Sequence, residues 1–186
     1  MSRVLFVTNG HGEASIAERI SLELRSKLPD ASVDHLALVG SAANEGLNEV
    51  GPRRAMPSGG LIAMGNVRKL LTDLRAGLVG LTLRQLRFLR GARGAYSVVV
   101  AVGDVYALAM ALVAGARTVF VGSAKSVEVA RYGPFEQRIL ARAAACFVRD
   151  DATARDLGRR GLRVDVGNAI VDLFPTTENG AAEWAV

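Results

Sequence analysis

The sequence predicts an α/β fold: a doubly wound, mostly parallel sheet with helices on both faces. Three observations carry this prediction. Short apolar runs alternate with segments of helical periodicity along almost the whole chain, which is typical of α/β proteins. The run SVVVAV at 97–102 has the composition of a strand that is buried on both faces. The first 39 residues read as strand, glycine-rich turn, helix and strand, a unit that makes parallel strands through a right-handed crossover.

The first half of the chain supplies that unit and a long connection. Residues 3–8 are apolar and β-branched and predict a strand, and residues 9–12 predict a turn. Residues 13–28 predict a helix, because an apolar side chain recurs every four positions, at Ile16, Ile20, Leu24 and Leu28. A second strand is expected at 32–39 and a loop at 40–60. Residues 61–89 are helical in character, with breaks expected at Gly77 and Gly80.

The second half continues the alternation. Strands are expected at 97–102, 118–121, 145–148 and 163–166, and helices at 104–114, 134–144 and 151–160. We therefore expect one Rossmann-like lobe over residues 1–174, followed by a tail or linker at 175–186.

Composition excludes several classes of protein. Of the 186 residues, 50% are hydrophobic and 22% are charged, which excludes an intrinsically disordered chain. The single cysteine, Cys146, rules out an intrachain disulfide and disfavours a cysteine-based zinc site. The sequence shows no signal peptide and no apolar run of the about 20 residues that a membrane-spanning helix needs. We expect a cytoplasmic protein, either free or peripheral on the inner face of the membrane.

The charge is unevenly distributed. The net charge is +5, yet residues 53–93 hold nine basic residues and one acidic residue, so this segment carries +8 and the remainder −3. A basic segment on a mildly acidic body indicates an anionic partner: a membrane surface, a nucleic acid or a phosphorylated substrate. Nucleic acid is disfavoured, because Phe88 is the only aromatic residue of the segment that could stack on bases.

A first polar cluster follows the first predicted strand, and we expect it to line the binding cleft. It comprises Asn9, Gly10, His11, Gly12 and Glu13. The glycines allow the backbone to approach a ligand, and a histidine titrates near neutral pH. The cluster matches no phosphate-binding fingerprint, which disfavours a flavodoxin-like nucleotide-binding protein. The alternative interpretation is a simple turn and helix start.

Two further clusters follow later strands. Asp104 comes directly after the central strand and can serve as a general base, as a helix N-cap, or as both. Ser123, Lys125 and Ser126 follow the next strand, where the lysine can pair with a phosphate or simply be solvated. Because parallel strands end at one edge of a sheet, all these residues are expected near the ligand cleft.

The basic segment contains two more candidates. Ser58, Gly59 and Gly60 lie in a glycine-rich loop that either binds substrate or only starts a helix. Arg84, Arg87 and Arg90 are spaced three apart, beside an apolar stripe made by Leu78, Val79, Leu83, Leu86 and Leu89. Such a helix either lies on anionic lipid or packs on the sheet with its arginines in water.

Several strings of the sequence resemble the N-terminal half of the lipid-A-disaccharide-synthase-related proteins. They are NGHGE at 9–13, MPSGG at 56–60, DLRAGL at 73–78 and VGNAIVD at 166–172. The resemblance extends to about residue 172, nearly the whole chain. One departure is Ala169, which stands where the family usually has proline.

The resemblance implies the acceptor-binding lobe of a two-lobed GT-B glycosyltransferase that transfers a sugar from a nucleotide-sugar to a lipid-linked acceptor at the membrane surface. It implies that Asp104, or else His11, deprotonates the acceptor hydroxyl, and that Glu13 belongs to the same catalytic loop. It implies that the helix at 78–93 contacts the membrane. No metal or cofactor is expected, since the nucleotide-sugar is a substrate of the other lobe.

The partners expected from this interpretation are a lipid-linked or anionic acceptor, an anionic membrane surface, and a donor-lobe chain or a second copy of this chain. The lobe is expected to be inactive without a donor-binding lobe. The alternative is a non-catalytic module that binds a membrane surface or an anionic ligand.

Overall fold

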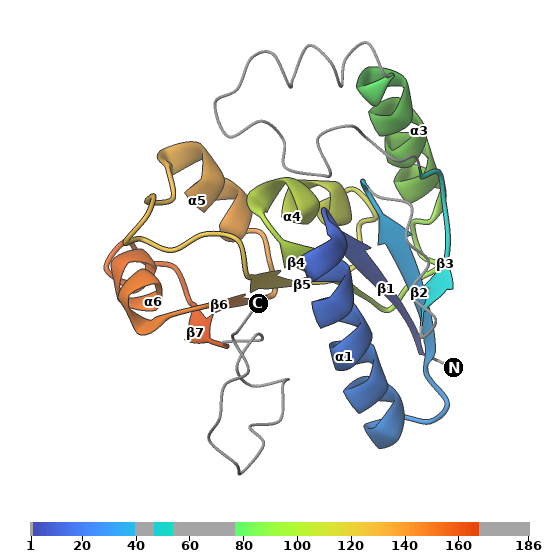
Figure 1. Ribbon diagram of the computed structural model, residues 1–186, viewed down its shortest axis with the longest axis horizontal. Coiled ribbons are helices and arrows are strands. Elements are labelled where there is room, and N and C mark those ends of the chain that lie inside the picture. The colour runs from blue at the N-terminus through green and yellow to red at the C-terminus, as the bar shows by residue number, and fades with distance from the viewer. Residues whose placement is uncertain (1, 40–46, 54–76, 168–186) are drawn as a thin grey trace, which may run out of the picture.

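The computed structural model describes residues 2–39, 47–53 and 77–167, and it has the predicted doubly wound α/β fold (Figure 1). Its sheet has seven strands, all parallel, in the order β3-β2-β1-β4-β5-β6-β7. The strands are β1 (Arg3–Thr8), β2 (Ser32–Ala37), β3 (Asn48–Glu49), β4 (Val98–Gly103), β5 (Arg117–Gly122), β6 (Ala145–Val148) and β7 (Asp165–Val166).

The helices of the described residues cover both faces of the sheet. They are α1 (His11–Lys27), α3 (Leu78–Gly91), α4 (Val105–Leu112), α5 (Pro134–Leu140) and α6 (Asp151–Gly158). From β1 the chain moves outward to β2, whereas from β4 it moves the opposite way, to β5 and then β6. Right-handed crossovers therefore place α1 on one face and α4, α5 and α6 on the other, where α3 also packs (Figure 1).

The core lies on both sides of the central strands. Leu5 and Val99 face the helix layer that contains α4, while Phe6 and Val102 face α1, and all four side chains are fully buried. This two-sided burial explains why β4 reads as a run of valines rather than as an alternating strand. The prediction of a strand buried on both faces is confirmed.

Two segments of the described residues differ in kind from the sequence expectation. Residues 48–49 pair with β2 as the edge strand β3, within a stretch that predicts a loop. Gly80 does not break a helix but lies inside α3, where it is exposed and a Cβ would meet open space, so its cost is only the low helix propensity of glycine. Gly77 does mark a boundary: it caps α3 with a left-handed φ of 91°.

A buried carboxylate fastens strands β1, β2 and β3 to the start of β4. Asp34 accepts hydrogen bonds from Arg3 Nη2 at 2.7 Å, Tyr96 Oη at 2.9 Å and Asn48 Nδ2 at 2.6 Å. Burial raises the pKa of Asp34, but the hydrogen bonds from Asn48, Arg3 and Tyr96 outweigh burial and hold the pKa below its ordinary value. The ionised carboxylate therefore stabilises this part of the sheet.

Within the described ranges, no helix is both long and apolar enough to cross a bilayer.

Candidate functional site

The topology places the switch point of the sheet at the carboxyl ends of β1 and β4. The chain leaves these two neighbouring strands in opposite directions, and ligands of doubly wound sheets bind at such a switch point. Asn9 follows β1 and Asp104 follows β4, so the first and second polar clusters predicted from the sequence meet here. We call the group Asn9, Glu13 and Asp104 the switch-point cluster.

Asp104 is held in one orientation by both of its oxygens. Oδ2 accepts a hydrogen bond from Asn9 Nδ2 at 2.9 Å, and Oδ1 accepts one from the backbone N–H of Ala107 at 2.9 Å. The second bond makes Asp104 the N-cap of α4, as its position after the strand predicts. The catalytic role of Asp104 stays a prediction.

Asn9 leaves one strong acceptor unused. Its side chain is only 6% exposed, and its Oδ1 is buried without a hydrogen-bond partner among the described residues. Buried polar atoms are nearly always paired in folded proteins, because an unpaired one forfeits its bonds to water. The Oδ1 of Asn9 is therefore an unused acceptor of the switch-point cluster that has almost no exposed surface.

Glu13 lies across the ends of both strands, packed against two glycines. A Cβ on Gly10 would come within 2.5 Å of Glu13 Oε2, and a Cβ on Gly103 within 2.8 Å of Glu13 Cγ. Gly103 also has a φ of 123°, a conformation that side-chain-bearing residues rarely adopt. Glycine at both positions thus makes room for the Glu13 side chain beside Asn9 and Asp104.

The other residues of the first cluster are on the surface. His11 and Gly12 are exposed in the first turn of α1. The carbonyl of His11 accepts a hydrogen bond from Ser15 Oγ at 3.2 Å. His11 is accessible to a ligand, but the hydrogen bonds that orient Asp104 come from Asn9 and Ala107.

The third cluster is engaged in contacts within the fold. Lys125 Nζ donates to Glu136 Oε1 at 2.9 Å and to Oε2 at 2.7 Å. Ser126 is buried, and its Oγ accepts from the backbone N–H of Glu128 at 3.3 Å, while Ser123 is half-buried. An anionic ligand would have to compete with Glu136 for Lys125.

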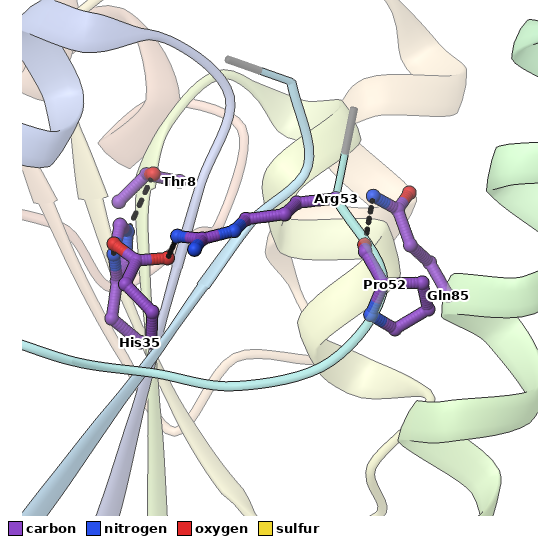
Figure 2. Close-up of polar contacts among 6 residues, drawn as sticks. Thr8, His35, Pro52, Arg53 and Gln85 are labelled. Atoms are coloured by element: carbon purple, nitrogen blue, oxygen red, sulfur yellow. Dashed lines mark hydrogen bonds and ion pairs between the residues drawn. The ribbon is translucent and has the colours of Figure 1, made fainter. Parts of the chain in front are cut away.

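Sequence reasoning missed a buried network beside the switch point (Figure 2). His35 Nδ1 lies 2.7 Å from Glu49 Oε1, and His35 Nε2 lies 2.9 Å from Thr8 Oγ1. Arg53 Nη1 forms an ion pair with Glu49 Oε2 at 3.2 Å. If the neutral His35 ring donates from Nδ1 to Glu49, its Nε2 accepts a hydrogen bond from the Thr8 hydroxyl.

The order of groups in this network is that of a nucleophile–histidine–acid triad, but its burial excludes that role. Thr8 and His35 have no exposed surface, so the hydroxyl cannot reach a substrate. The network instead ties the carboxyl end of β1 to β2 and β3, and so supports the turn that carries Asn9. Only the strand register, which pairs His35 with Glu49, could have revealed it.

Helix α3 is fastened over the ends of β2 and β3. Gln85 Nε2 donates to the carbonyl of Leu38 at 2.8 Å and to that of Pro52 at 3.1 Å, the second bond being drawn in Figure 2. The helix also buries Leu81 and Leu89. Its fixed position determines which residues face outward.

The outward face of α3 is basic and partly apolar. Arg84, Arg87 and Arg90 are exposed, and so are Val79 at 55% and Leu83 at 51%. Of the predicted apolar stripe, Leu89 is therefore buried in the core, whereas Val79 and Leu83 are exposed. We call these five exposed residues the basic face of α3.

The remaining predicted site residues, Ser58, Gly59 and Gly60, lie outside the described residues, as does the chain from 168 onward. Within the described part, no group of three or more histidine, cysteine or acidic side chains is arranged to hold a metal ion.

Comparison with known proteins adds no relative. No protein-family model matches the chain, and no curated protein sequence is significantly similar to it. The relation to lipid-A-disaccharide synthase thus stays a prediction.

Proposed function

We propose that this chain is the acceptor-binding lobe of a glycosyltransferase related to lipid-A-disaccharide synthase, and that it holds the acceptor hydroxyl at the switch point. The observation that carries the proposal is the switch-point cluster, in which the half-buried Glu13 lies against Gly103 and Asn9 orients the half-buried carboxylate of Asp104. These groups accept hydrogen bonds, which suits the hydroxyls of a sugar. A phosphate at the same helix N-terminus would meet the Glu13 carboxylate and be repelled.

In this proposal Asp104 is the general base. It accepts the proton of the acceptor hydroxyl as that oxygen forms its bond to the anomeric carbon of the donor sugar. The bond from that carbon to the nucleotide diphosphate breaks, and the leaving group takes the electron pair. The hydrogen bonds from Asn9 and Ala107 keep the carboxylate from rotating away from the hydroxyl.

The acceptor half of the proposal is tested by binding a minimal glycolipid. Titration with n-octyl β-glucoside below its micelle-forming concentration, followed by protein NMR, is expected to shift the amide signals of the first turn of α1. An octyl polyethylene glycol ether, which lacks the sugar, is expected not to shift them. Glu13→Gln and Asp104→Asn should weaken binding, whereas Glu23→Gln, exposed on the same helix, should not. Equal shifts by both detergents would refute sugar recognition.

A second candidate function, a non-catalytic module that binds an anionic membrane surface, is favoured by the basic face of α3. Its three arginines attract anionic headgroups, and Val79 and Leu83 can enter the apolar layer beneath them. The same face would bring an acceptor lobe to a lipid-linked substrate, so membrane binding alone is common to both functions. Sugar binding separates them.

The membrane contact is tested by reversing charge. The double variant Arg84→Glu/Arg87→Glu is expected to lose cosedimentation with vesicles containing phosphatidylglycerol. The matched control is Arg138→Glu/Arg142→Glu, which makes the same change in charge at exposed positions near α5. Unchanged binding of the first variant, or equal loss in the control, would contradict docking through α3.

A further inference from the structure

Exposed arginines gather at the amino edge of the sheet, opposite the switch point. Helices α3, α4, α5 and α6 end at this edge, where four segments lead the chain into β4, β5, β6 and β7. The segments cover residues 92–97, 113–117, 141–144 and 159–164, and each contains at least one exposed arginine. We call the six arginines of these segments the arginine edge: Arg93, Arg117, Arg142, Arg159, Arg160 and Arg163.

Hydrogen bonds place the four segments side by side. Arg93 Nε donates to the carbonyl of Val113 at 3.1 Å, which joins the first segment to the second. The backbone N–H of Ala144 donates to the carbonyl of Thr118 at 2.7 Å, which sets the third segment beside the start of β5. The fourth segment enters β7, which pairs with β6. Because neighbouring strands lie about 4.8 Å apart, the row from β4 to β7 is about 14 Å long.

The positive charge of this edge is only partly balanced. The four segments contain no acidic residue. Two carboxylates adjoin the fourth segment: Asp156 Oδ2 accepts from Arg160 Nε at 3.3 Å, and Asp165 is exposed at the start of β7. The other five arginines form no ion pair with a described residue. Six arginines against two carboxylates leave this edge with a charge of +4.

Helix dipoles do not account for the whole row. The negative end of a helix favours a cation within its last turn. Arg117 and Arg163, however, lie five residues past the last residues of α4 and α6, and α4 has no basic residue in its last turn. Both side chains are exposed and make no ion pair with a described residue. The row therefore indicates an anion outside the fold.

The composition of the arginine edge fits a phosphate backbone better than a bilayer. None of the large apolar side chains exposed in the described part lies in the four segments, whereas Val79 and Leu83 accompany the arginines of α3. Every cation of the edge is an arginine, whose planar guanidinium binds phosphate oxygens in pairs. A bilayer bound here would also hold the switch point about 20 Å away, the length of a six-residue strand.

The aromatic content of the segments favours a double-stranded polyanion. Proteins that bind single strands stack the bases on exposed aromatic side chains, and Tyr96, the aromatic residue of these segments, is buried and donates to Asp34. A double helix can be held through its phosphates alone. A row of about 14 Å spans a major groove of about 12 Å and so reaches the phosphates on both of its sides. The lack of stacking residues, which disfavours nucleic acid at residues 53–93, does not disfavour such backbone contacts.

We propose that the arginine edge binds the phosphate backbone of double-stranded DNA without reading its sequence. Arginine–phosphate contacts carry no information about the bases, so duplexes of different sequence bind alike. The proposal does not rest on the proposed function, since the edge lies at the opposite end of the strands from Asp104 and leaves the switch point open.

The test measures binding of a fluorescein-labelled DNA duplex of about 20 base pairs by fluorescence anisotropy over a range of salt concentrations. Arg117→Gln/Arg142→Gln is expected to weaken binding about tenfold at about 50 mM salt, and to reduce the slope of log K against log salt concentration by about two. The matched control is Arg131→Gln/Arg149→Gln, which removes the same charge at exposed positions in the connections that follow β5 and β6. The control should keep the wild-type slope.

A second pair keeps the test independent of one variant's folding. Arg93→Gln/Arg163→Gln lies on different segments of the same edge and is expected to reduce the slope equally, and the urea midpoint of each variant reports its folding. Equal weakening in the Arg131→Gln/Arg149→Gln control would show attraction to the total charge of the chain and overturn the proposal. So would a strong preference for one duplex sequence, or vesicle cosedimentation lost in the edge variants while duplex binding is kept. Failure of the wild type to bind the duplex would overturn this proposal and leave sugar binding at the switch point unaffected.

Discussion

The most direct test of the switch-point geometry is the replacement of Gly103 by alanine. The backbone there has a φ of 123°, and the new Cβ would lie 2.8 Å from Glu13 Cγ. The positive φ alone costs about 1–3 kcal/mol, and the contact adds the cost of moving an aliphatic carbon in the middle of a side chain. We expect Gly103→Ala to lower the free energy of unfolding by about 3 kcal/mol.

Gly10→Ala is the matched comparison. Gly10 has a φ of −178°, which any residue adopts, and its new Cβ would meet only the flexible carboxylate end of Glu13 at 2.5 Å from Oε2. The carboxylate can move aside, so we expect Gly10→Ala to cost about 0–1 kcal/mol. The two variants thus separate backbone strain from displacement of Glu13.

The assay is urea unfolding of each glycine variant in the wild-type and the Glu13→Ala backgrounds. Removal of Glu13 should abolish the cost of Gly10→Ala and reduce that of Gly103→Ala by about 1 kcal/mol, leaving the strain of the positive φ. A Gly103→Ala cost that disappears with Glu13→Ala would refute backbone strain. A cost unaffected by Glu13→Ala would refute the position of Glu13 over the strand ends.

Three further predictions follow from the same contacts. Asp104→Ala should lower the free energy of unfolding by about 1 kcal/mol in urea denaturation, because α4 loses its N-cap, while Asp104→Asn should retain most of it; equal losses would argue against the cap. The pKa of Asp34 is lower in the folded than in the unfolded state, so its stabilisation is complete above the ordinary pKa of aspartate and is lost as pH falls through the folded value. Urea midpoints below pH 4 should therefore fall more steeply for the wild type than for Asp34→Asn, and parallel curves would contradict this. His35→Ala should cost about 3 kcal/mol or more, since it leaves a cavity and the unpaired groups of Thr8 and Glu49, whereas His11→Ala at the surface should stay within about 0.5 kcal/mol; similar urea midpoints for the two histidine variants would show that the buried network contributes little.

The sheet could be predicted from the sequence wherever strands are long and buried. The valine run of β4 and the apolar run of β1 identify central strands, because only a strand covered on both faces lacks polar alternation. The two-residue strand β3 could not be predicted, since Asn48 and Glu49 carry no periodic pattern and pair only because β2 presents an open edge. The break expected at Gly80 was wrong, because the anchoring of α3 by Gln85, Leu81 and Leu89 outweighs the propensity of one exposed glycine.

The candidate site was predictable in part. Asn9, Glu13 and Asp104 follow strands, and the parallel arrangement brings strand ends to one edge, so their proximity follows from the fold class. The pairing of Lys125 with Glu136 does not follow, since it depends on the path of the connection between β5 and α5. The lack of a hydrogen-bond partner for the Tyr132 hydroxyl among the described residues does not follow either, since it depends on which polar groups the neighbouring elements place around it.

By itself, therefore, the sequence determined the order and type of the main elements, the parallel sheet, and the cluster of polar residues that follows the strands. Tertiary structure alone decided the contacts of those residues: Asn9 on Asp104, Glu13 over Gly103, and His35 between Thr8 and Glu49. The physical reason is that element type depends on residues close together in the sequence, whereas these contacts join residues far apart in it. Periodicity and turn propensity act over a few residues, whereas a hydrogen bond between Asn9 and Asp104 depends on strand order and register across the whole sheet.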